Sequence, residues 1–69
     1  MTEISVVING RERAVPAAMT LRELLEHLEL EPSMVVVERN REIVERDRYA
    51  EVEVEEGDAL ELVHFVGGG

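Results

Sequence analysis

The chain of 69 residues has room for one small hydrophobic core, since a domain of this size buries only about 60% of the surface that its unfolded chain exposes. Sixteen acidic residues against seven arginines give a formal net charge of −9, which disfavours binding to a phosphate backbone. There is no cysteine, which excludes disulfides, thiolate metal sites and sulfur chemistry on a thiol side chain. We therefore expect a single domain that binds protein partners with positive surface charge.

The sequence has no feature typical of a membrane or secreted protein. No apolar run approaches the roughly 18 residues that a membrane helix needs, and no signal-peptide pattern is present. We expect a cytoplasmic protein that binds neither membranes nor nucleic acids.

The first predicted element is a β-hairpin over residues 3–16. In the segment Glu3–Ile8 the apolar residues Ile4, Val6 and Ile8 stand at every second position, which indicates a strand. Asn9-Gly10 follows, and both residues tolerate the positive φ angles of a type I′ turn. A strict two-residue turn places Val6 opposite Arg13, so either a bulge shifts the register or the arginine stem covers the apolar face. The sequence leaves both alternatives open.

A capping box predicts the start of a helix. The Thr20 hydroxyl can accept a hydrogen bond from the N–H of Glu23, whose carboxylate can accept one from the N–H of Thr20. Because a proline pushes the preceding residue out of the helical region, we expect a helix of about ten residues that begins at Thr20 and is ended by Pro32. Its apolar stripe consists of leucines at helical spacing, namely Leu21, Leu24, Leu25 and Leu28.

Short strands are predicted in the second half of the chain. One helix among such strands predicts an α+β fold, with a mixed sheet of four to five strands around one helix. The expected segments are a strand at 34–37 that is apolar on both faces, a turn at 40–41, an edge strand at 42–44, an alternating segment around Val52 and Val54, a turn at 56–58 and a last strand at 59–66.

The last strand has an unusual outer face. If Leu60 and Leu62 face the helix, then Val63 and Phe65 face outward next to the C-terminus. Together with Val66 they would form a patch for docking a partner, unless a neighbouring loop covers them.

Three glycines, Gly67, Gly68 and Gly69, end the chain. Glycine adds nothing to a core, but three extended residues span roughly 10 Å and fit a channel too narrow for side chains. The tail therefore favours a role in which a partner takes up the terminal carboxylate.

Other groups of residues carry weaker signals. His27 and His64 are the only histidines and have no cysteine beside them, so we expect no metal site. The acidic residues at 55–58 are expected to form a solvated turn, since no nucleophile accompanies them. Tyr49 is expected to pack its ring at the edge of the core with its hydroxyl bonded to the backbone.

Taken together, these motifs resemble the ThiS family, the sulfur carrier proteins of thiamin biosynthesis. The resemblance covers essentially the whole chain and implies a β-grasp fold like that of ubiquitin, with a domain over 1–66 and a flexible reactive tail over 67–69. The residues that carry it are Asn9-Gly10, the capped leucine helix, and residues 37–40, 48–52, 57–58 and 61–69, of which the last segment is the most specific.

The resemblance implies a carrier protein and not an enzyme. In that family a ThiF-type adenylyltransferase uses ATP and Mg²⁺, which the carrier itself does not bind, to adenylate the terminal carboxylate, here that of Gly69. Sulfur from a cysteine desulfurase route then displaces AMP and leaves a thiocarboxylate, which passes the sulfur to the thiazole synthase ThiG. By the same resemblance Gly67 and Gly68 thread the partner channel, and Val63, Phe65 and Val66 dock at its mouth.

Two alternatives stay open at this stage. A related ubiquitin-like carrier could deliver sulfur for molybdopterin, or a modifier could be conjugated to another protein through Gly69. A β-grasp interaction module with incidental glycines is the other class, and it would tolerate deletion of Gly68 and Gly69.

Overall fold

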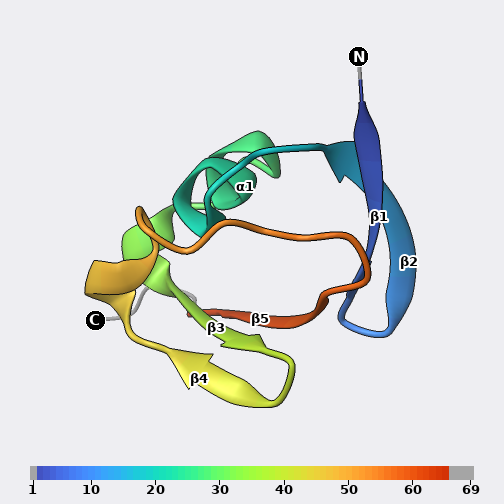
Figure 1. The fold of residues 1–69 in the computed structure, drawn as a ribbon. Helices are drawn as coiled ribbons and strands as arrows, with labels where there is room; N and C mark the ends of the chain where they lie inside the picture. Colours follow the sequence, from blue (N-terminus) through green and yellow to red (C-terminus); the bar gives the residue numbers. More distant parts are fainter. Residues whose placement is uncertain (1, 66–69) are drawn as a thin grey trace.

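The computed structural model describes residues 2–65, so the predicted domain end at residue 66 and the tail at 67–69 lie outside it. Five strands form one mixed sheet in the order β2-β1-β5-β3-β4, and a single α-helix packs against one of its faces (Figure 1). No helix in this part of the chain is long and apolar enough to cross a membrane. The elements are β1 (Glu3–Ile8), β2 (Arg11–Pro16), α1 (Leu21–His27), η1 (Pro32–Met34), β3 (Val35–Arg39), β4 (Glu42–Val44), η2 (Arg46–Arg48) and β5 (Ala59–His64), where η denotes a 3₁₀ turn.

The first hairpin adopts the strict two-residue register. Asn9 and Gly10 have φ angles of 51° and 83°, as a type I′ turn requires, and Ile8 pairs directly with Arg11. Val6 therefore lies opposite Arg13 with no bulge between them. This pairing excludes the first of the two alternatives, a shifted register. Val6 is 1% exposed, whereas the Arg13 opposite it is exposed.

The predicted capping box is present at the start of α1. The N–H of Glu23 donates to the Thr20 hydroxyl at 3.1 Å, and the N–H of Thr20 donates to the Glu23 carboxylate at 3.0 Å. Thr20 is the cap, and the helix itself begins at Leu21. Leu21, Leu24 and Leu25 are fully buried, which places the predicted apolar stripe against the sheet.

The prediction that Pro32 ends this helix is wrong. The helix has seven residues and ends in a Schellman motif, in which the N–H of Leu30 donates to the carbonyl of Leu25 at 2.8 Å and the N–H of Glu29 to that of Glu26 at 2.9 Å. Glu29 has a φ of 64°, a conformation that usually belongs to glycine. Pro32 instead opens η1, where its missing N–H is tolerated.

Strand β3 is apolar on both faces, as predicted. Val35 and Val37 are fully buried, while Val36 between them lies on the other face and is partly buried. The segment around Val52 and Val54 does not join the sheet. Glu53 in this segment forms one isolated β-bridge with Thr20. Val54 still reaches the core at 3% exposure.

Candidate functional site

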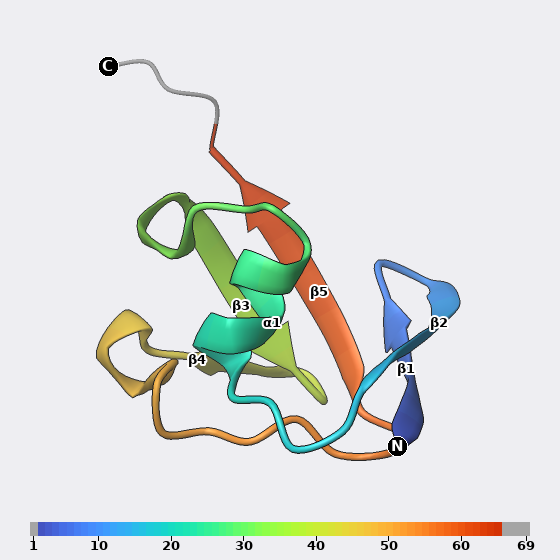
Figure 2. The ribbon, with the colours of Figure 1, turned by 90° about the horizontal axis from the view of Figure 1, so that it is seen from above.

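Strand β5, which leads to the C-terminus, lies inside the sheet and not at its edge. It runs parallel to β1, with Val7 opposite Ala59, and antiparallel to β3, with Val37 opposite Leu62 (Figure 2). The pairing with β3 extends over five residues and the pairing with β1 over only two. The strand is therefore held along most of its length by β3 and near its start by β1.

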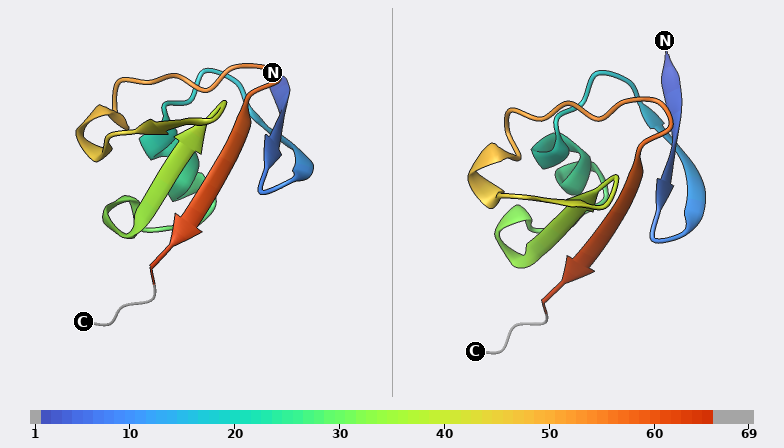
Figure 3. Two further views of the ribbon diagram at one scale, coloured as in Figure 1. Left: turned by 90° about the horizontal axis from the view of Figure 1, so that it is seen from below. Right: turned by 60° about the horizontal axis from the view of Figure 1, so that its bottom comes forward.

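The outer face of this strand is apolar near the C-terminus. Val63 is 54% exposed and Phe65 is 51% exposed, so no neighbouring loop of the described chain covers them. The partly buried Val36 lies directly opposite Val63, and the N–H of Phe65 donates to the carbonyl of Met34 at 2.8 Å. Helix α1 lies behind the sheet in the views of Figure 3, which leaves this face open. The predicted outward orientation of Val63 and Phe65 is confirmed.

Two like charges border the apolar residues on the same face. Glu38 lies directly opposite Glu61 across β3 and β5, and Ile43, which is 69% exposed, lies opposite Glu38 on β4. Carboxylates in this position repel each other across the strands. The outer face thus combines an apolar end with an acidic centre, which suits a partner surface that is both apolar and basic.

The side chain of Asn9 joins the first hairpin turn to β5. Its Oδ1 accepts from the N–H of Leu62 at 2.8 Å, its Nδ2 donates to the carbonyl of Leu62 at 3.2 Å, and its own N–H donates to the carbonyl of Leu60 at 2.9 Å. The amide group thereby takes the place of one more residue of the parallel ladder. The Asn9-Gly10 motif predicts the turn but not this contact, because the partner lies 53 residues away.

The start of β5 is held by Asn40 and Asp58. Asn40 and Arg41 form a second two-residue turn with φ angles of 51° and 73°. Asn40 accepts from the N–H of Ala59 at 3.0 Å and donates to Asp58 at 3.1 Å. Both hairpin turns thus present an asparagine to the same strand.

The prediction of a solvated acidic turn at 55–58 is wrong for Asp58, which is 5% exposed. Its Oδ2 accepts from the Arg39 guanidinium and from the N–H of Glu55, each at 2.9 Å. Burial alone would raise the pKa of the Asp58 carboxyl, but the hydrogen bonds from Arg39, Glu55 and Asn40, with the charge of Arg39, outweigh it and lower the pKa below its ordinary value. Asp58 is therefore ionised at neutral pH and stabilises the start of β5.

Tyr49 has the structural role that the sequence predicts. Its ring is 3% exposed, and its hydroxyl donates to the carbonyl of Val35 at 2.8 Å and accepts from the N–H of Val37 at 3.1 Å. The hydroxyl satisfies the backbone of β3 on the side away from β5.

Of the remaining predicted residues, some lie within the described part of the chain and others do not. Val66, Gly67, Gly68 and Gly69 lie outside the described residues. His27 lies in the last turn of α1 and His64 at the end of β5, and both are exposed. Among residues 2–65 no group of three or more histidine, cysteine or acidic side chains could hold a metal ion.

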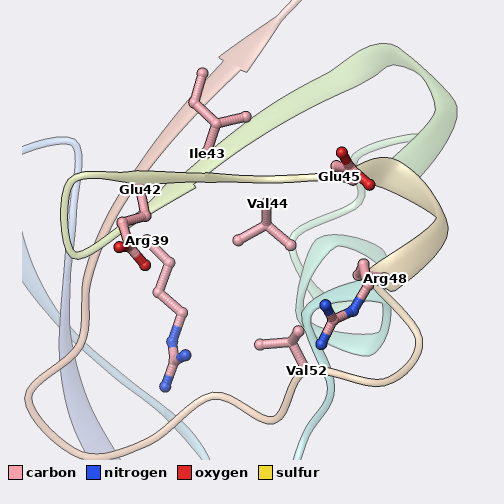
Figure 4. Close-up of a pocket in the computed structure, with 7 residues that line it drawn as sticks. All are labelled: Arg39, Glu42, Ile43, Val44, Glu45, Arg48 and Val52. Atoms are coloured by element: carbon pink, nitrogen blue, oxygen red, sulfur yellow. The ribbon is translucent and has the colours of Figure 1, made fainter.

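A recess of about 400 Å³ lies between β4, η2 and the following loop (Figure 4). Two arginines line it, but Arg39 is paired with Asp58 at 2.9 Å and Arg48 with Glu51 at 3.4 Å. The acidic Glu42 and Glu45 also line it, so the recess has no excess of positive charge that would bind an anion. It contains none of the residues predicted for the site.

Residues 6–69 match the ThiS family. The sulfur carrier protein ThiS of Bacillus subtilis is 52% identical over 50 residues, which make up 72% of this chain and 76% of that protein. A thiazole synthase of Paramagnetospirillum magneticum is 50% identical over 66 residues, which cover 96% of this chain but 20% of that protein. The chain therefore spans about a fifth of the length of the thiazole synthase that it matches.

Solved structures support the same assignment. A thiamine biosynthesis protein (ThiS) from Geobacter metallireducens superposes with a TM-score of 0.81 at 33% identity, over 96% of this chain and 100% of that one. A designed protein based on human erythrocytic ubiquitin superposes with a TM-score of 0.57 at 17% identity, over 100% of this chain and 98% of that one, which supports the β-grasp fold alone. Because the family match runs through nearly the whole chain, the protein belongs to the ThiS family.

Proposed function

We propose that this chain carries sulfur for thiamin biosynthesis as a thiocarboxylate on Gly69. A ThiF-type adenylyltransferase would use ATP and Mg²⁺ to convert the Gly69 carboxylate to an acyl adenylate. Sulfur from a cysteine desulfurase route would then displace AMP, and the thiocarboxylate would deliver its sulfur to a ThiG-type thiazole synthase. We place these steps in the cytoplasm.

The observation that carries this proposal is the family match, which extends to residue 69 and so includes the terminal glycine. A carrier of this kind keeps its chemistry at the terminal carboxylate and needs no catalytic side chains of its own. The absence of cysteine from the sequence fits this use of the main chain, since sulfur cannot be held on a thiol. Adenylation is required because a carboxylate oxygen is a poor leaving group and AMP a good one.

The thiazole synthase relative supports the choice of acceptor. The segment that matches this chain occupies 20% of that protein, so a carrier-like sequence and a protein named for thiazole synthesis are joined in one polypeptide. Joining two proteins raises their effective concentration for each other, which is useful when one delivers a group to the other. We infer that this chain delivers its sulfur to a synthase of the same kind.

The exposed apolar end of β5 supports the docking role of Val63, Phe65 and Val66. Ordering the tail in a channel costs about 1–2 kcal/mol per residue of backbone entropy, which contacts of the folded domain must offset. Val63 and Phe65 lie where such contacts would form, directly before the tail.

Intact mass spectrometry tests the proposal. The chain is incubated with a ThiF-type adenylyltransferase, ATP, Mg²⁺ and a sulfide donor, next to a chain that lacks Gly69. The full chain is expected to gain the mass difference between sulfur and oxygen, and the shortened chain is not. If the full chain stays unchanged while the same enzyme converts the Bacillus subtilis carrier, the proposed chemistry is wrong for this protein.

A further inference from the structure

The open edge of β5 at His64 lies between the Asn9 contact and the C-terminal tail. Along a strand, the N–H and C=O of one residue point to the same side, and successive residues alternate. The carbonyl of Leu60 and both backbone groups of Leu62 bond to Asn9 on the β1 side, while the N–H of Phe65 points to β3 and donates to the carbonyl of Met34. The N–H and C=O of His64 therefore point to the β1 side.

Nothing within residues 2–65 pairs with His64 on that side. The pairing of β1 with β5 stops at Leu60, and the Asn9 amide extends it only to Leu62. The hydrogen bonds outside the regular ladders do not reach the His64 backbone. Figures 2 and 3 show why, since the β1–β2 hairpin diverges from β5 toward the end of that strand.

On the other side of the β3–β5 pair, the backbone groups of β3 do have a partner. On β3 the hydroxyl of Tyr49 satisfies Val35 and Val37, the groups that face away from β5. On β5 the corresponding position beyond Asn9 has no such side chain in the described structure, and His64 is exposed. One pair of backbone groups is thus left for a partner immediately before the tail.

We propose that this edge accepts an extended segment of the adenylating enzyme, which adds to β5 beside His64. An exposed strand edge is a template for such pairing, and main-chain hydrogen bonds supply affinity without demands on side chains. The net charge of −9 calls for basic side chains on the added segment. This inference rests on the proposed function, because it assigns a docking mode to the enzyme that activates Gly69.

Amide hydrogen exchange in the complex tests the inference directly. The amide of His64 is expected to exchange rapidly in the free chain and at least about tenfold more slowly when the adenylating enzyme is bound, because a hydrogen bond then protects it. The amide of Leu62 serves as the internal control, since Asn9 binds it in the free chain already. An unchanged exchange rate at His64 in a complex that forms overturns the proposal.

A pair of variants gives an independent measurement. His64→Pro removes the N–H that points to the open edge and breaks no bond within the described fold, whereas His64→Ala keeps that N–H and removes the imidazole. We expect His64→Pro to weaken binding to the adenylating enzyme about five- to tenfold, the effect of one lost hydrogen bond, and His64→Ala to leave it unchanged. Equal affinities of the two variants contradict the inference.

The controls separate this inference from the proposed function. If the unmodified chain does not bind the adenylating enzyme and is not adenylated, the proposed function fails. If it binds and is adenylated but the His64 amide stays unprotected, only the pairing at the strand edge is wrong. Should His64→Pro fail to fold, the exchange measurement on the unmodified chain decides alone.

Discussion

Asp58 is the one charged residue that is buried among residues 2–65, and its environment explains why. It receives hydrogen bonds from the β3–β4 hairpin through Arg39 and Asn40 and from its own turn through Glu55. A buried carboxylate is tolerated only when it is paired and hydrogen-bonded in this way. The spacing of acids in the sequence does not reveal this, because Arg39 and Asn40 lie 19 and 18 residues away.

Replacing Asp58 should change how stability depends on pH. Because the folded pKa is lowered, the ionised carboxyl stabilises the protein above its ordinary pKa of about 3.9, and this contribution is lost as the pH falls through the folded pKa. Asp58→Asn should lower the free energy of unfolding by about 1–3 kcal/mol at pH 7, and the deficit should shrink below about pH 4. Urea unfolding across this range measures it.

The exposed Asp47 supplies the control for that experiment. Asp47→Asn makes the same chemical change outside the buried cluster, so it should leave the free energy of unfolding nearly unchanged at every pH. A deficit for Asp58→Asn that stays constant from neutral to acidic pH would contradict the role assigned to its charge.

Tyr49 gives a second prediction at this scale. Tyr49→Phe keeps the buried ring but leaves the N–H of Val37 without its partner in the core. The free energy of unfolding should fall by about 1–3 kcal/mol, the penalty of an unsatisfied buried group. Thermal or urea unfolding measures it, and a loss below about 0.5 kcal/mol would show that water replaces the hydroxyl.

At the scale of single elements, local patterns predict where strands and the helix begin better than where they end. The capping box and the Asn9-Gly10 turn are short-range signals, and both have the expected geometry. The end of α1 was not predictable in the same way, because its Schellman motif has Glu29 where glycine is usual. The alternation at Val52 and Val54 indicates an extended chain but does not say whether a neighbouring strand is available to pair with it.

Replacing Glu29 by glycine should stabilise the end of α1. Its φ of 64° is unfavourable for a residue with a side chain, so Glu29→Gly should raise the free energy of unfolding by about 0.5–1 kcal/mol. Glu26→Gly removes the same charge from the body of the helix and should lower it by about 1 kcal/mol. Chemical unfolding of both variants checks the pair; changes of the same sign would contradict the role assigned to the helix end.

At the scale of the whole molecule, composition and periodicity predicted the class of fold, a mixed sheet around one helix. They could not predict which strands are neighbours, since the order β2-β1-β5-β3-β4 depends on contacts between distant segments. For the site, the alternation of β5 predicted the exposure of Val63 and Phe65, while the contacts from Asn9 and Asn40 needed the folded chain. The roles of Val66 and Gly67–Gly69 stay predictions.

Docking of the whole domain should depend on the apolar end of β5. Phe65→Glu should weaken association with the adenylating enzyme by roughly tenfold or more, because a half-exposed aromatic is replaced by a charge that a contact would desolvate. Ala50→Glu adds the same charge beside α1, away from this face, and is the matched control. Affinity is measured by calorimetry, with circular dichroism to verify folding; equal affinities for the two variants would exclude Phe65 from the interface.

The central position of β5 also determines how the domain responds to force on its C-terminus. A partner that draws the tail into a channel pulls β5 along its own axis, while its hydrogen bonds to β1, β3 and Asn9 run across that axis. The load is then shared by all of these bonds in shear, and they cannot open one after another as in peeling. Force applied through the C-terminus should therefore be resisted more strongly than force that peels an edge strand from the sheet.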